Sequence, residues 1–493
     1  MHIGAVARRE PDRPAVIMGT SGETVTFGAL DRESSRLARL FRERDLEAES
    51  RLAILIGNEP SFHTVCWAAQ RSGLVWTPLN THLTSRELSQ ILNDSGATML
   101  IASERFAGVA EELLAMELPQ LRHRLMIGSV IDGWESVEGA LAASTGSDDL
   151  QELEGVSLLY SSGTTGQPKG IYRRPSLVPM GTAAYPVADL LTRVGLRDGD
   201  VYLSAAPLYH AAPLNWSMSA QRLGAAVVVM ERFDAGWALE LIERHRVDVA
   251  QFVPTMLIRM FRLHEQGATT ADVSSLRAVV HAGGPCPPDV KRRVIGWLGP
   301  IVYEYYGATE GIGTTFLDSS EWLAHPGSVG RAVRGIVHVL GDDGTELGPA
   351  ATGTVWFEGN SDFEYLNDPE KTAGGRNASG YVTVGDIGHL DDDGYLYLTD
   401  RAAHTIIRGG VNIYPREIED VLLSHPKVAD AAVIGVADAE LGERVAAVVE
   451  PAVWESAGPA LEDELMAHCL RQLARFKVPE CFTFERSLPR LET

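Results

Sequence analysis

The stretch Leu158–Ile171 reads LLYSSGTTGQPKGI, and its character changes along its length. A strand-like apolar start passes into a loop of Ser, Gly and Thr that closes on Pro168-Lys169-Gly170. Glycine lets a backbone approach a ligand closely, and the N–H groups and hydroxyls of such a loop can surround an anion such as phosphate. Lys169 adds a point charge for the same anion. The stretch therefore predicts a phosphate-binding loop that follows a buried strand.

Two other interpretations of this loop can be weighed from its residues. A flexible Gly/Ser linker is the first, but linkers seldom follow a buried strand or contain a Pro-Lys pair. The second is the Walker A loop, G-x-x-x-x-G-K-[ST]. It is excluded because Pro168 stands where that loop needs Gly, and Gly170 where it needs Ser or Thr. The sequence indicates a phosphate site of another kind.

The loop resembles the signature of the adenylate-forming superfamily, which includes acyl-CoA synthetases, aryl-CoA ligases, peptide-synthetase adenylation domains and luciferases. That signature reads S-[ST]-G-[ST]-T-G-x-P-K-G, and residues 161–170 agree with it at all ten positions. The resemblance implies ATP, Mg²⁺ and coenzyme A as reactants alongside a carboxylic acid. It assigns nucleotide contacts to Ser161, Ser162, Gly163, Thr165 and Gly166, catalytic roles to Lys169 and Thr164, and a metal contact to Thr164.

Strand and helix patterns alternate on both sides of the loop. Before it, we expect strands at 51–57, 75–79 and 98–102 and helices at 27–44, 61–72 and 86–95. After it, we expect strands at 200–206, 225–230, 249–253 and 276–281 and a helix at 238–246. This alternation predicts an α/β fold with a mostly parallel sheet covered on both faces. A chain of 493 residues is too long for one core, and the resemblance adds a small β-rich subdomain and a small, mobile α+β C-terminal domain.

Composition limits the partners of the chain. Hydrophobic residues make up 45% and charged residues 22%, and 43 basic against 66 acidic residues give a net charge of −23. Such an acidic chain argues against nucleic acid as a partner, and ATP should then need a local cluster of positive charge. Four cysteines without a CxxC pair suit a reducing cytosol. We expect a cytoplasmic protein, because no signal peptide is present and no apolar run reaches the roughly 20 residues that cross a bilayer. The sequence does not decide the oligomeric state, and a homodimer is one possibility.

A second motif, IVYEYYGATEG at residues 301–311, matches the aromatic-Gly-x-Thr-Glu motif of the same superfamily. Through this resemblance Tyr306 offers a flat face to adenine and Thr309 a hydroxyl to phosphate. Glu310 is a hard oxygen ligand suited to Mg²⁺, with a catalytic role. Tyr305 and Gly307 complete the nucleotide contacts expected from this motif.

A glycine turn follows the strand expected at 276–281. Consecutive glycines at a strand end leave room for a planar ligand over the backbone, although a plain turn is the alternative. The resemblance assigns Gly283, Gly284 and Pro285 to the adenine side of the site.

The acyl group should lie near Tyr209-His210, at the carboxyl end of the strand expected at 200–206, where α/β folds bind ligands. His210 alone would suit a structural histidine, but the resemblance makes it a catalytic residue that contacts or gates the acyl group. The candidates for the pocket wall are Trp216, Phe252, His281 and Ile312. They carry no fixed charge, and no Asp follows the Tyr-His pair to hold an ammonium. The acid should therefore be apolar, whether fatty, aryl or sterol-derived.

A third motif, GYVTVGDIGHLDDDGYLYLTDR at residues 380–401, contains the hairpin signal Asp392-Asp393-Gly394. In the resemblance, the carboxylate of Asp386 accepts both ribose hydroxyls, and Arg401 closes the motif near the ribose or the leaving phosphates. The domain boundary is expected here, giving a large domain of residues 1–400 and a small one of residues 401–493. The family's hinge Asp or Lys is replaced around Ala403 and His404.

The small domain resembles the lid on the CoA side of the family. The segment 406–428 supplies Arg408, Gly409 and Gly410 as the expected CoA contacts, with a helix beginning at Pro415 and strands at 431–435 and 444–449. The family ends in a segment like L-P-R-x-x-T-G-K, whereas this chain stops at Thr493 without the Gly-Lys. Either the sequence is truncated there, which we expect, or the catalytic lysine is missing.

Taken together, the motifs predict an AMP-forming acyl-CoA synthetase. Within the same superfamily the alternative is an acyl-AMP ligase that loads a carrier protein. From another class, the alternative is a non-catalytic protein that binds a nucleotide or an acyl group.

Overall fold

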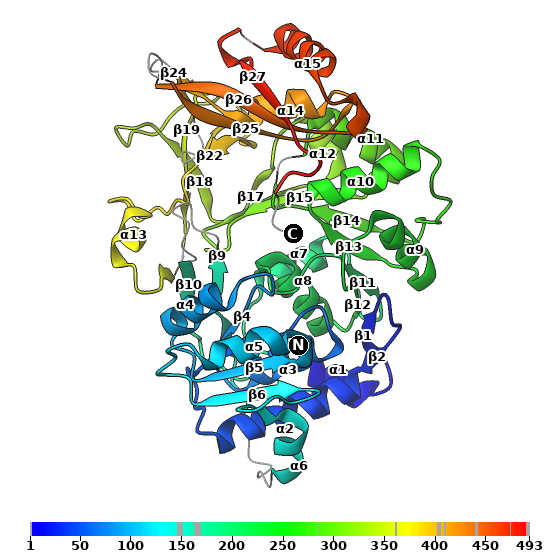
Figure 1. Ribbon diagram of the computed structural model, residues 1–493, viewed down its shortest axis with the longest axis vertical. Helices are drawn as coiled ribbons and strands as arrows, with labels where there is room; N and C mark the ends of the chain where they lie inside the picture. The colour runs from blue at the N-terminus through cyan, green and yellow to red at the C-terminus, as the bar shows by residue number, and fades with distance from the viewer. Residues whose placement is uncertain are drawn as a thin grey trace.

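The computed structural model describes residues 2–144, 151–161, 169–284, 286–359, 362–401, 406–408, 411–438, 442–473 and 475–489. These residues form a large N-terminal domain of mostly parallel sheets layered with helices and a small α+β C-terminal domain, which lies at one end of the elongated molecule (Figure 1). The predicted α/β fold class is confirmed. Among the described residues, no helix is both long and apolar enough to cross a membrane.

The first sheet of the large domain has six parallel strands in the order β7-β6-β5-β3-β4-β8. Its strands are β3 (Arg51–Leu55), β4 (Val75–Pro78), β5 (Met99–Ser103), β6 (His123–Ile127), β7 (Glu135–Ser136) and β8 (Val156–Ser157). The helices of this region are α2 (Phe27–Glu43), α3 (Pro60–Arg71), α4 (Ser85–Ser95), η1 (Glu104–Phe106), α5 (Ala107–Leu114) and α6 (Val137–Ala143). The strands and helices expected here from periodicity are confirmed, with ends that shift by one or two residues.

The second sheet has nine strands in the order β17-β16-β15-β14-β13-β11-β12-β1-β2, parallel from β15 to β1 and antiparallel at both edges. Its strands are β1 (Pro14–Met18), β2 (Thr24–Thr26), β11 (Val201–Ser204), β12 (Ala226–Val229), β13 (Val249–Phe252), β14 (Ala278–His281), β15 (Val302–Gly307), β16 (Thr314–Leu317) and β17 (Arg331–Arg334). The helices around it are α1 (Ile3–Arg9), α7 (Pro186–Arg193), α8 (Ala211–Arg222), α9 (Ala235–His245), α10 (Pro254–Glu265), α11 (Pro288–Leu298) and α12 (Ser319–Ala324).

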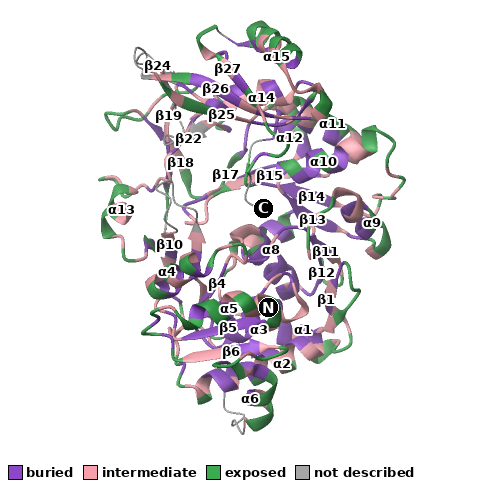
Figure 2. Ribbon diagram, in the orientation of Figure 1, coloured by how far each residue is buried: buried purple, intermediate pink, exposed green. Residues whose placement is uncertain are grey.

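Both faces of this second sheet are buried, as the predicted helical cover requires. Successive side chains of a strand point to opposite faces, so Tyr202 packs into one hydrophobic core and its neighbour Leu203 into another. Figure 2 shows β13 and β14 as buried, whereas α15 of the small domain exposes much of its surface.

Two small antiparallel sheets complete the large domain. One has three strands in the order β20-β10-β9, namely β9 (Leu159–Ser161), β10 (Lys169–Arg173) and β20 (Phe363–Tyr365), and α13 (Pro369–Gly374) follows it. The other is formed by β18 (Ile336–Leu340), β19 (Gly353–Glu358), β21 (Asp386–Leu390) and β22 (Leu396–Arg401), and it confirms the predicted hairpin. The apolar segment that leads into the signature loop forms two short strands rather than one, β8 and β9. It breaks at the buried Leu158, where the chain leaves the parallel sheet for the small one.

The C-terminal domain is a five-stranded sheet with two helices. It consists of β23 (Ile406–Arg408), β24 (Val411–Ile413), α14 (Pro415–Leu423), β25 (Val428–Asp438), β26 (Gly442–Pro451), η3 (Trp454–Ser456), α15 (Pro459–Gln472), η4 (Arg475–Lys477) and β27 (Cys481–Phe484). Its buried hydrophobic residues, from Ile406 to Phe482, form a core that is separate from the cores of the large domain. The helix expected at Pro415 is confirmed, while β25 and β26 are longer than expected because they pair along most of their length.

Candidate nucleotide and acyl site

Lys169, the last residue but one of the signature, is the first residue of strand β10. Ser161 at the end of β9 is its partner across the ladder, so the chain leaves the small sheet and re-enters it at the same point. Residues 162–168, with Ser162, Gly163, Thr164, Thr165 and Gly166, lie outside the described residues, as does the side chain of Ser161. Their assignments stay predictions, and the site is built from the residues on either side of them.

The ammonium of Lys169 is held by a carboxylate that the sequence analysis did not single out. Lys169 Nζ lies 2.9 Å from Oδ2 of Asp368, and both side chains are partly buried. The other oxygen, Oδ1, accepts the backbone N–H of Lys371 at 3.0 Å, which makes Asp368 the N-cap of α13. These contacts, first of all the one with Lys169, lower the pKa of Asp368. The Asp-Pro pair at 368–369 is a usual helix start, and that signal could have revealed the helix though not its partner.

Glu310 lies in the turn after β15, and two groups from the small sheet hold this turn. The hydroxyl of Tyr365 donates to Glu310 Oε1 at 2.8 Å. Nη2 of Arg173 donates to the carbonyl of Thr309 at 2.6 Å. Gly311 has a positive φ of 64°, and a Cβ there would overlap the Arg173 guanidinium, so this close packing requires glycine. The predicted metal carboxylate is thus fixed by residues of β10 and β20.

Positive charge gathers around this turn, as the acidic composition led us to expect for a phosphate site. Burial and the neighbouring Lys169 lower the pKa of Lys371. Burial and the neighbouring Arg334 likewise lower the pKa of Arg173, which Glu310 acts to raise. Within each of these two pairs the positive charges lie close enough to repel, and a bound polyphosphate would relieve that repulsion.

The residues predicted for the base and the ribose meet in the fold. The hydroxyl of Tyr306, near the end of β15, donates to Oδ2 of Asp386, which is 5% exposed at the start of β21. Asp386 is also the ladder partner of Arg401, whose side chain lies outside the described residues. Gly307, the last residue of β15, is exposed. The structure therefore places two motifs separated by about 80 residues side by side.

The glycine turn after β14 leaves its backbone open. Gly283 has a φ of 83°, and the nearest atom to a Cβ added there is a methyl of Val253 at 3.6 Å. Gly283 and Gly284 are both exposed, while Pro285 lies outside the described residues. The turn lies at the carboxyl edge of the parallel sheet, where α/β folds bind ligands.

His210 is the N-cap of α8, and its ring lies 4.5 Å from that of Tyr209. The segment before it is fixed by Asn58, which follows β3. Its Oδ1 accepts the N–H of Leu208 at 2.8 Å, and its Nδ2 donates to the carbonyls of Ala206 and Met230. These contacts give Asn58 a structural role, because they hold the backbone that leads to Tyr209 and His210.

The four candidates for the acyl pocket are buried but do not form one cluster. Trp216 is fully buried in one core, and its Nε1 donates to the hydroxyl of Tyr305 at 3.1 Å. Phe252 and His281 are partners on the neighbouring strands β13 and β14, and Ile312 packs beside Tyr306 in a third cluster. The structure brings Trp216 to Tyr305 and Phe252 to His281.

His281 is neutral at physiological pH. It is fully buried, and burial lowers its pKa to about 3. Its Nε2 lies 3.6 Å from Oε2 of Glu304, beyond hydrogen-bond distance, and Glu304 instead binds Lys291. Neither ring nitrogen has a hydrogen-bond partner among the described residues. The neutral ring adds no charge of its own to the predicted pocket, and the charges beside it, those of Glu304 and Lys291, are paired with each other.

Arg408 is engaged inside the small domain. Its guanidinium forms an ion pair with Glu480 and donates to the carbonyl of Phe476 at 2.9 Å. Gly409 and Gly410 lie outside the described residues. The CoA contacts assigned to this loop therefore stay predictions.

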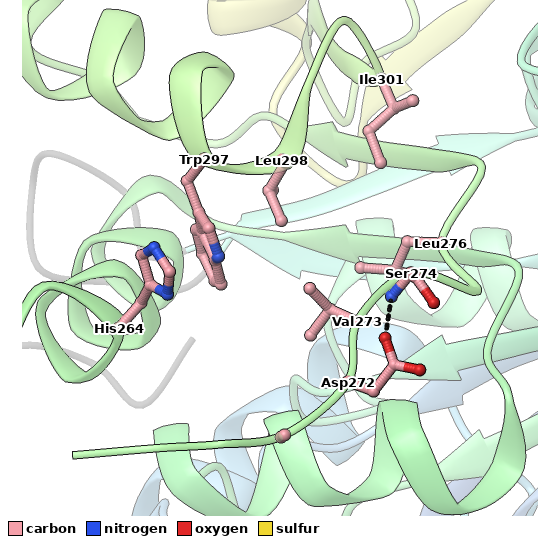
Figure 3. A pocket seen from close by; sticks show the side chains of 9 residues that line it. His264, Asp272, Val273, Ser274, Leu276, Trp297, Leu298 and Ile301 are labelled. Carbon is pink, nitrogen blue, oxygen red and sulfur yellow. Dashed lines mark hydrogen bonds between the residues drawn. The ribbon is translucent and has the colours of Figure 1, made fainter. Parts of the chain in front are cut away.

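A separate hollow of about 430 Å³ lies between α10 and α11 (Figure 3). Its wall includes His264 stacked on Trp297 with ring centroids 4.7 Å apart, and the carboxylate of Asp272. Leu276 and Ile301, which precede β14 and β15, place it at the amino edge of the parallel sheet. None of the residues predicted for the nucleotide or the acid lines it.

Comparison with known proteins finds the same family that the signature loop resembles. The sequence profile of the AMP-binding enzyme family matches residues 4–364, and that of the AMP-binding enzyme C-terminal domain matches residues 417–493. A fatty acid–[acyl-carrier-protein] ligase, ScoC of Streptomyces coeruleorubidus, is 32% identical over 98% of this chain and 92% of its own. The long-chain-fatty-acid–CoA ligase FadD13 of Mycobacterium tuberculosis is 31% identical over 98% of this chain and 93% of its own. Among solved structures, o-succinylbenzoate CoA synthetase (MenE) of Bacillus subtilis with its acyl-adenylate superposes with a TM-score of 0.82 at 28% identity, covering 99% of this chain and 95% of that one.

The chain belongs to the family of AMP-binding enzymes, the adenylate-forming superfamily that its signature loop resembles. Its class is that of the ATP-dependent, AMP-forming acid–thiol ligases, a family that uses ATP as a substrate and Mg²⁺ as its metal cofactor.

The described residues suit a metal held mainly by phosphate. Among them, no group of three or more His, Cys, Asp or Glu side chains could hold a metal ion alone. Glu310 has one oxygen bound to Tyr365 and a second carboxylate oxygen beside it. Mg²⁺ commonly takes one or two carboxylates and completes its shell with substrate phosphates and water, so a single carboxylate next to the cations fits this metal.

Proposed function

We propose that the protein is an AMP-forming acyl-CoA synthetase that acts on an apolar carboxylic acid. Its large domain would comprise residues 1–400 and its small domain residues 401–493. The observation that carries the proposal is that Lys169, Glu310 and Asp386, from three separate motifs, each have a side chain held by another residue of the fold. Asp368 holds Lys169, and the hydroxyls of Tyr365 and Tyr306 hold Glu310 and Asp386. The cations around the Glu310 turn supply the positive charge that the acidic chain otherwise lacks.

The first half-reaction joins the acid to AMP. The carboxylate attacks the α-phosphate of ATP, pyrophosphate leaves, and an acyl-adenylate forms. Lys169 and the loop hydroxyls of Thr164 and Thr165 bind the phosphates and stabilise the charge that develops on them. Glu310 and Thr164 would hold Mg²⁺, which would supply further positive charge there. Asp386 accepts the ribose hydroxyls while the Tyr306 hydroxyl keeps its carboxylate oriented.

The second half-reaction transfers the acyl group to a thiol. The sulfur of CoA attacks the acyl carbon of the acyl-adenylate, the bond from that carbon to the phosphate oxygen breaks, and AMP leaves. AMP is a far better leaving group than the oxygen of a free carboxylate. His210 contacts or gates the acyl group at the start of α8. Arg401 lies near the ribose or the leaving phosphates, and Arg408, Gly409 and Gly410 line the approach of CoA.

The class of acid follows from the candidate wall. Trp216, Phe252 and Ile312 are apolar, and the low pKa of His281 keeps that ring uncharged. An amino acid would need a carboxylate for its ammonium, and none follows Tyr209-His210. A fatty, aryl or sterol-derived acid therefore suits this site better. A cytoplasmic enzyme, alone or as a homodimer, with no nucleic acid partner, is part of the same proposal.

A carrier protein is the second candidate acceptor, because ScoC, a relative aligned along almost the whole chain, is named for loading an acyl-carrier protein. Measuring AMP release with CoA, with a carrier protein bearing its pantetheine arm, and with neither would separate the two. Release that needs the carrier and ignores CoA would replace CoA in the proposal.

The site assignment is tested by pyrophosphate release over a panel of carboxylic acids. Lys169→Ala and Glu310→Ala should each lower the rate by about 10²–10³-fold, the usual loss for one group that stabilises transition-state charge. Lys427→Ala is the matched control, because that lysine is half-exposed and pairs with Glu464 in the small domain. Rates that stay at the wild-type level in both site variants would refute the assignment.

A further inference from the structure

Tyr365 lies at the junction of a strand and a short helix, next to Glu310. The turn that follows it is closely bonded. The N–H of Asp368 donates to the carbonyl of Tyr365 at 3.0 Å, and the N–H of Tyr365 donates to Oγ1 of Thr372 at 2.9 Å. That hydroxyl in turn donates to the carbonyl of Asp368 at 2.8 Å. The backbone of Tyr365 is thereby fixed from both sides.

The ring of Tyr365 is fixed as well. It is 7% exposed, and the ring of Phe363 packs edge-on against it with centroids 5.4 Å apart. Nζ of Lys371 lies 4.1 Å from the ring centroid on the face of the ring. Across the ladder Tyr365 is paired with Ile171 of β10, two residues after Lys169. A ring packed on these sides can hold its hydroxyl in one place.

The hydroxyl of this fixed ring reaches Glu310. Its hydrogen bond to Oε1 of Glu310 is 2.8 Å long and joins residues 55 positions apart in the chain. A carboxylate with one oxygen held by a buried donor has lost the freedom to rotate and presents its other oxygen in a constant direction. Such partners behind a metal ligand commonly contribute ten- to a hundredfold to metal affinity or activity.

We propose that Tyr365 is a positioning residue that orients the Glu310 carboxylate toward the metal–phosphate side of the site. The proposal rests on the metal role given to Glu310 in the proposed function. Through β20 and its partner β10, the same segment ties this carboxylate to Lys169, whose ammonium Asp368 holds. The geometry of cation and carboxylate is therefore set by one small sheet rather than by the signature loop alone.

The test compares ATP binding with and without magnesium, measured by calorimetry on the full chain. Tyr365→Phe removes only the hydroxyl. It should weaken ATP binding in Mg²⁺ by roughly tenfold, while binding in excess EDTA stays within about twofold. Tyr172→Phe is the matched control, because Tyr172 lies on β10 with its side chain on the opposite face of the same sheet and near Arg51. Equal binding of Mg·ATP by Tyr365→Phe and the wild type would overturn the proposal.

A double-mutant cycle separates positioning from a merely structural effect. In a Glu310→Ala background, Tyr365→Phe should have no further effect on Mg·ATP binding, because its target is gone. An equal loss in both backgrounds would show that Tyr365 acts on the fold and would overturn the inference while leaving the role of Glu310 intact. If Glu310→Ala itself binds Mg·ATP like the wild type, the proposed function of Glu310 fails first and the inference fails with it.

Discussion

At the residue scale, a buried ion pair holds the chain that leads into the signature loop. Glu154 and Arg222 are each less than 5% exposed and are joined by two parallel hydrogen bonds of 3.1 and 2.8 Å. The Tyr185 hydroxyl and the Gln70 amide also donate to Glu154, so every part of the carboxylate is engaged. Through Arg222 the segment before β8 is attached to α8, and through Gln70 it is attached to α3. From this segment the chain continues through β8 and β9 into the signature loop.

Removing the positive partner should be costly. Arg222→Met leaves Glu154 buried and uncompensated, and breaking a buried pair in this way costs about 3–5 kcal/mol. Urea denaturation of the variant measures the loss as a lower midpoint. The exposed pair Arg292–Asp289 provides the comparison, since Arg292→Ala should cost less than about 1 kcal/mol. Similar losses in the two variants would mean that Arg222 is not the source of stability assigned to it.

At the element scale, β16 and β17 pass very close to each other just after the Glu310 turn. Gly330, which precedes β17, has a φ of 97°, and a Cβ placed on it would lie 2.4 Å from the carbonyl group of Phe316 in β16. Phe316 pairs with Arg331 in the antiparallel ladder. The close approach fixes the position of β16, which follows the Glu310 turn. A side chain at Gly330 would push β16 and β17 apart.

Gly330→Ala should therefore destabilise the large domain by more than backbone strain alone explains. Gly344→Ala isolates the strain, because Gly344 has a φ of 79° with no atom within 4 Å of an added Cβ. We expect about 1–2 kcal/mol for Gly344→Ala and a further 1–3 kcal/mol from steric overlap for Gly330→Ala. Paired urea denaturation curves give both values. If the two substitutions lower the free energy of unfolding equally, steric overlap at Gly330 contributes nothing, which would refute the close approach of β16 and β17.

At the scale of the whole molecule, the small domain rests on the corner of the large one formed by α10 and the β14–α11 connection. Nη2 of Arg262 on α10 donates to the carbonyl of Val428 at 2.9 Å. On the small domain, Arg416 and Asp420 of α14 lie within electrostatic range of Cys286. The Asp420 side chain is half-buried there, and its Oδ1, which is buried, has no hydrogen-bond partner among the described residues.

This buried carboxylate makes the stability of the folded protein depend on pH. Burial raises the pKa of Asp420 to about 6, which Arg416 offsets only in part. The folded state binds this proton more tightly than the unfolded chain, so its stability increases as the pH falls from above 6 toward 3.8, and the full penalty is present above pH 6. Asp420→Asn should therefore raise the melting temperature most at pH 7.5, and the gain should shrink steadily as the pH falls from 6 toward 4. Asp463→Asn, at an exposed site of α15, is the control. A gain independent of pH would contradict the mechanism.

The sequence by itself determined the α/β class and most strand and helix positions, and it predicted the residue types of the site. Strands such as 249–253 and helices such as 27–44 follow from periodicity, which depends only on neighbouring residues. The roles expected of Lys169, Glu310 and Asp386 came from contiguous motifs whose spacing is local. The prediction that an acidic chain would need clustered cations around its phosphates also needed no coordinates.

Only the tertiary structure decided which side chains serve these residues. Asp368 lies 199 positions from Lys169, and Tyr365 lies 55 positions from Glu310. Each has an ordinary local setting, a helix cap and a strand aromatic, so nothing in the neighbouring sequence shows its partner. The split at Leu158 into strands of two sheets was hidden for the same reason, because only one residue separates the two strands along the chain. Periodicity records which face of an element is buried, whereas the contact across that face depends on how distant segments pack.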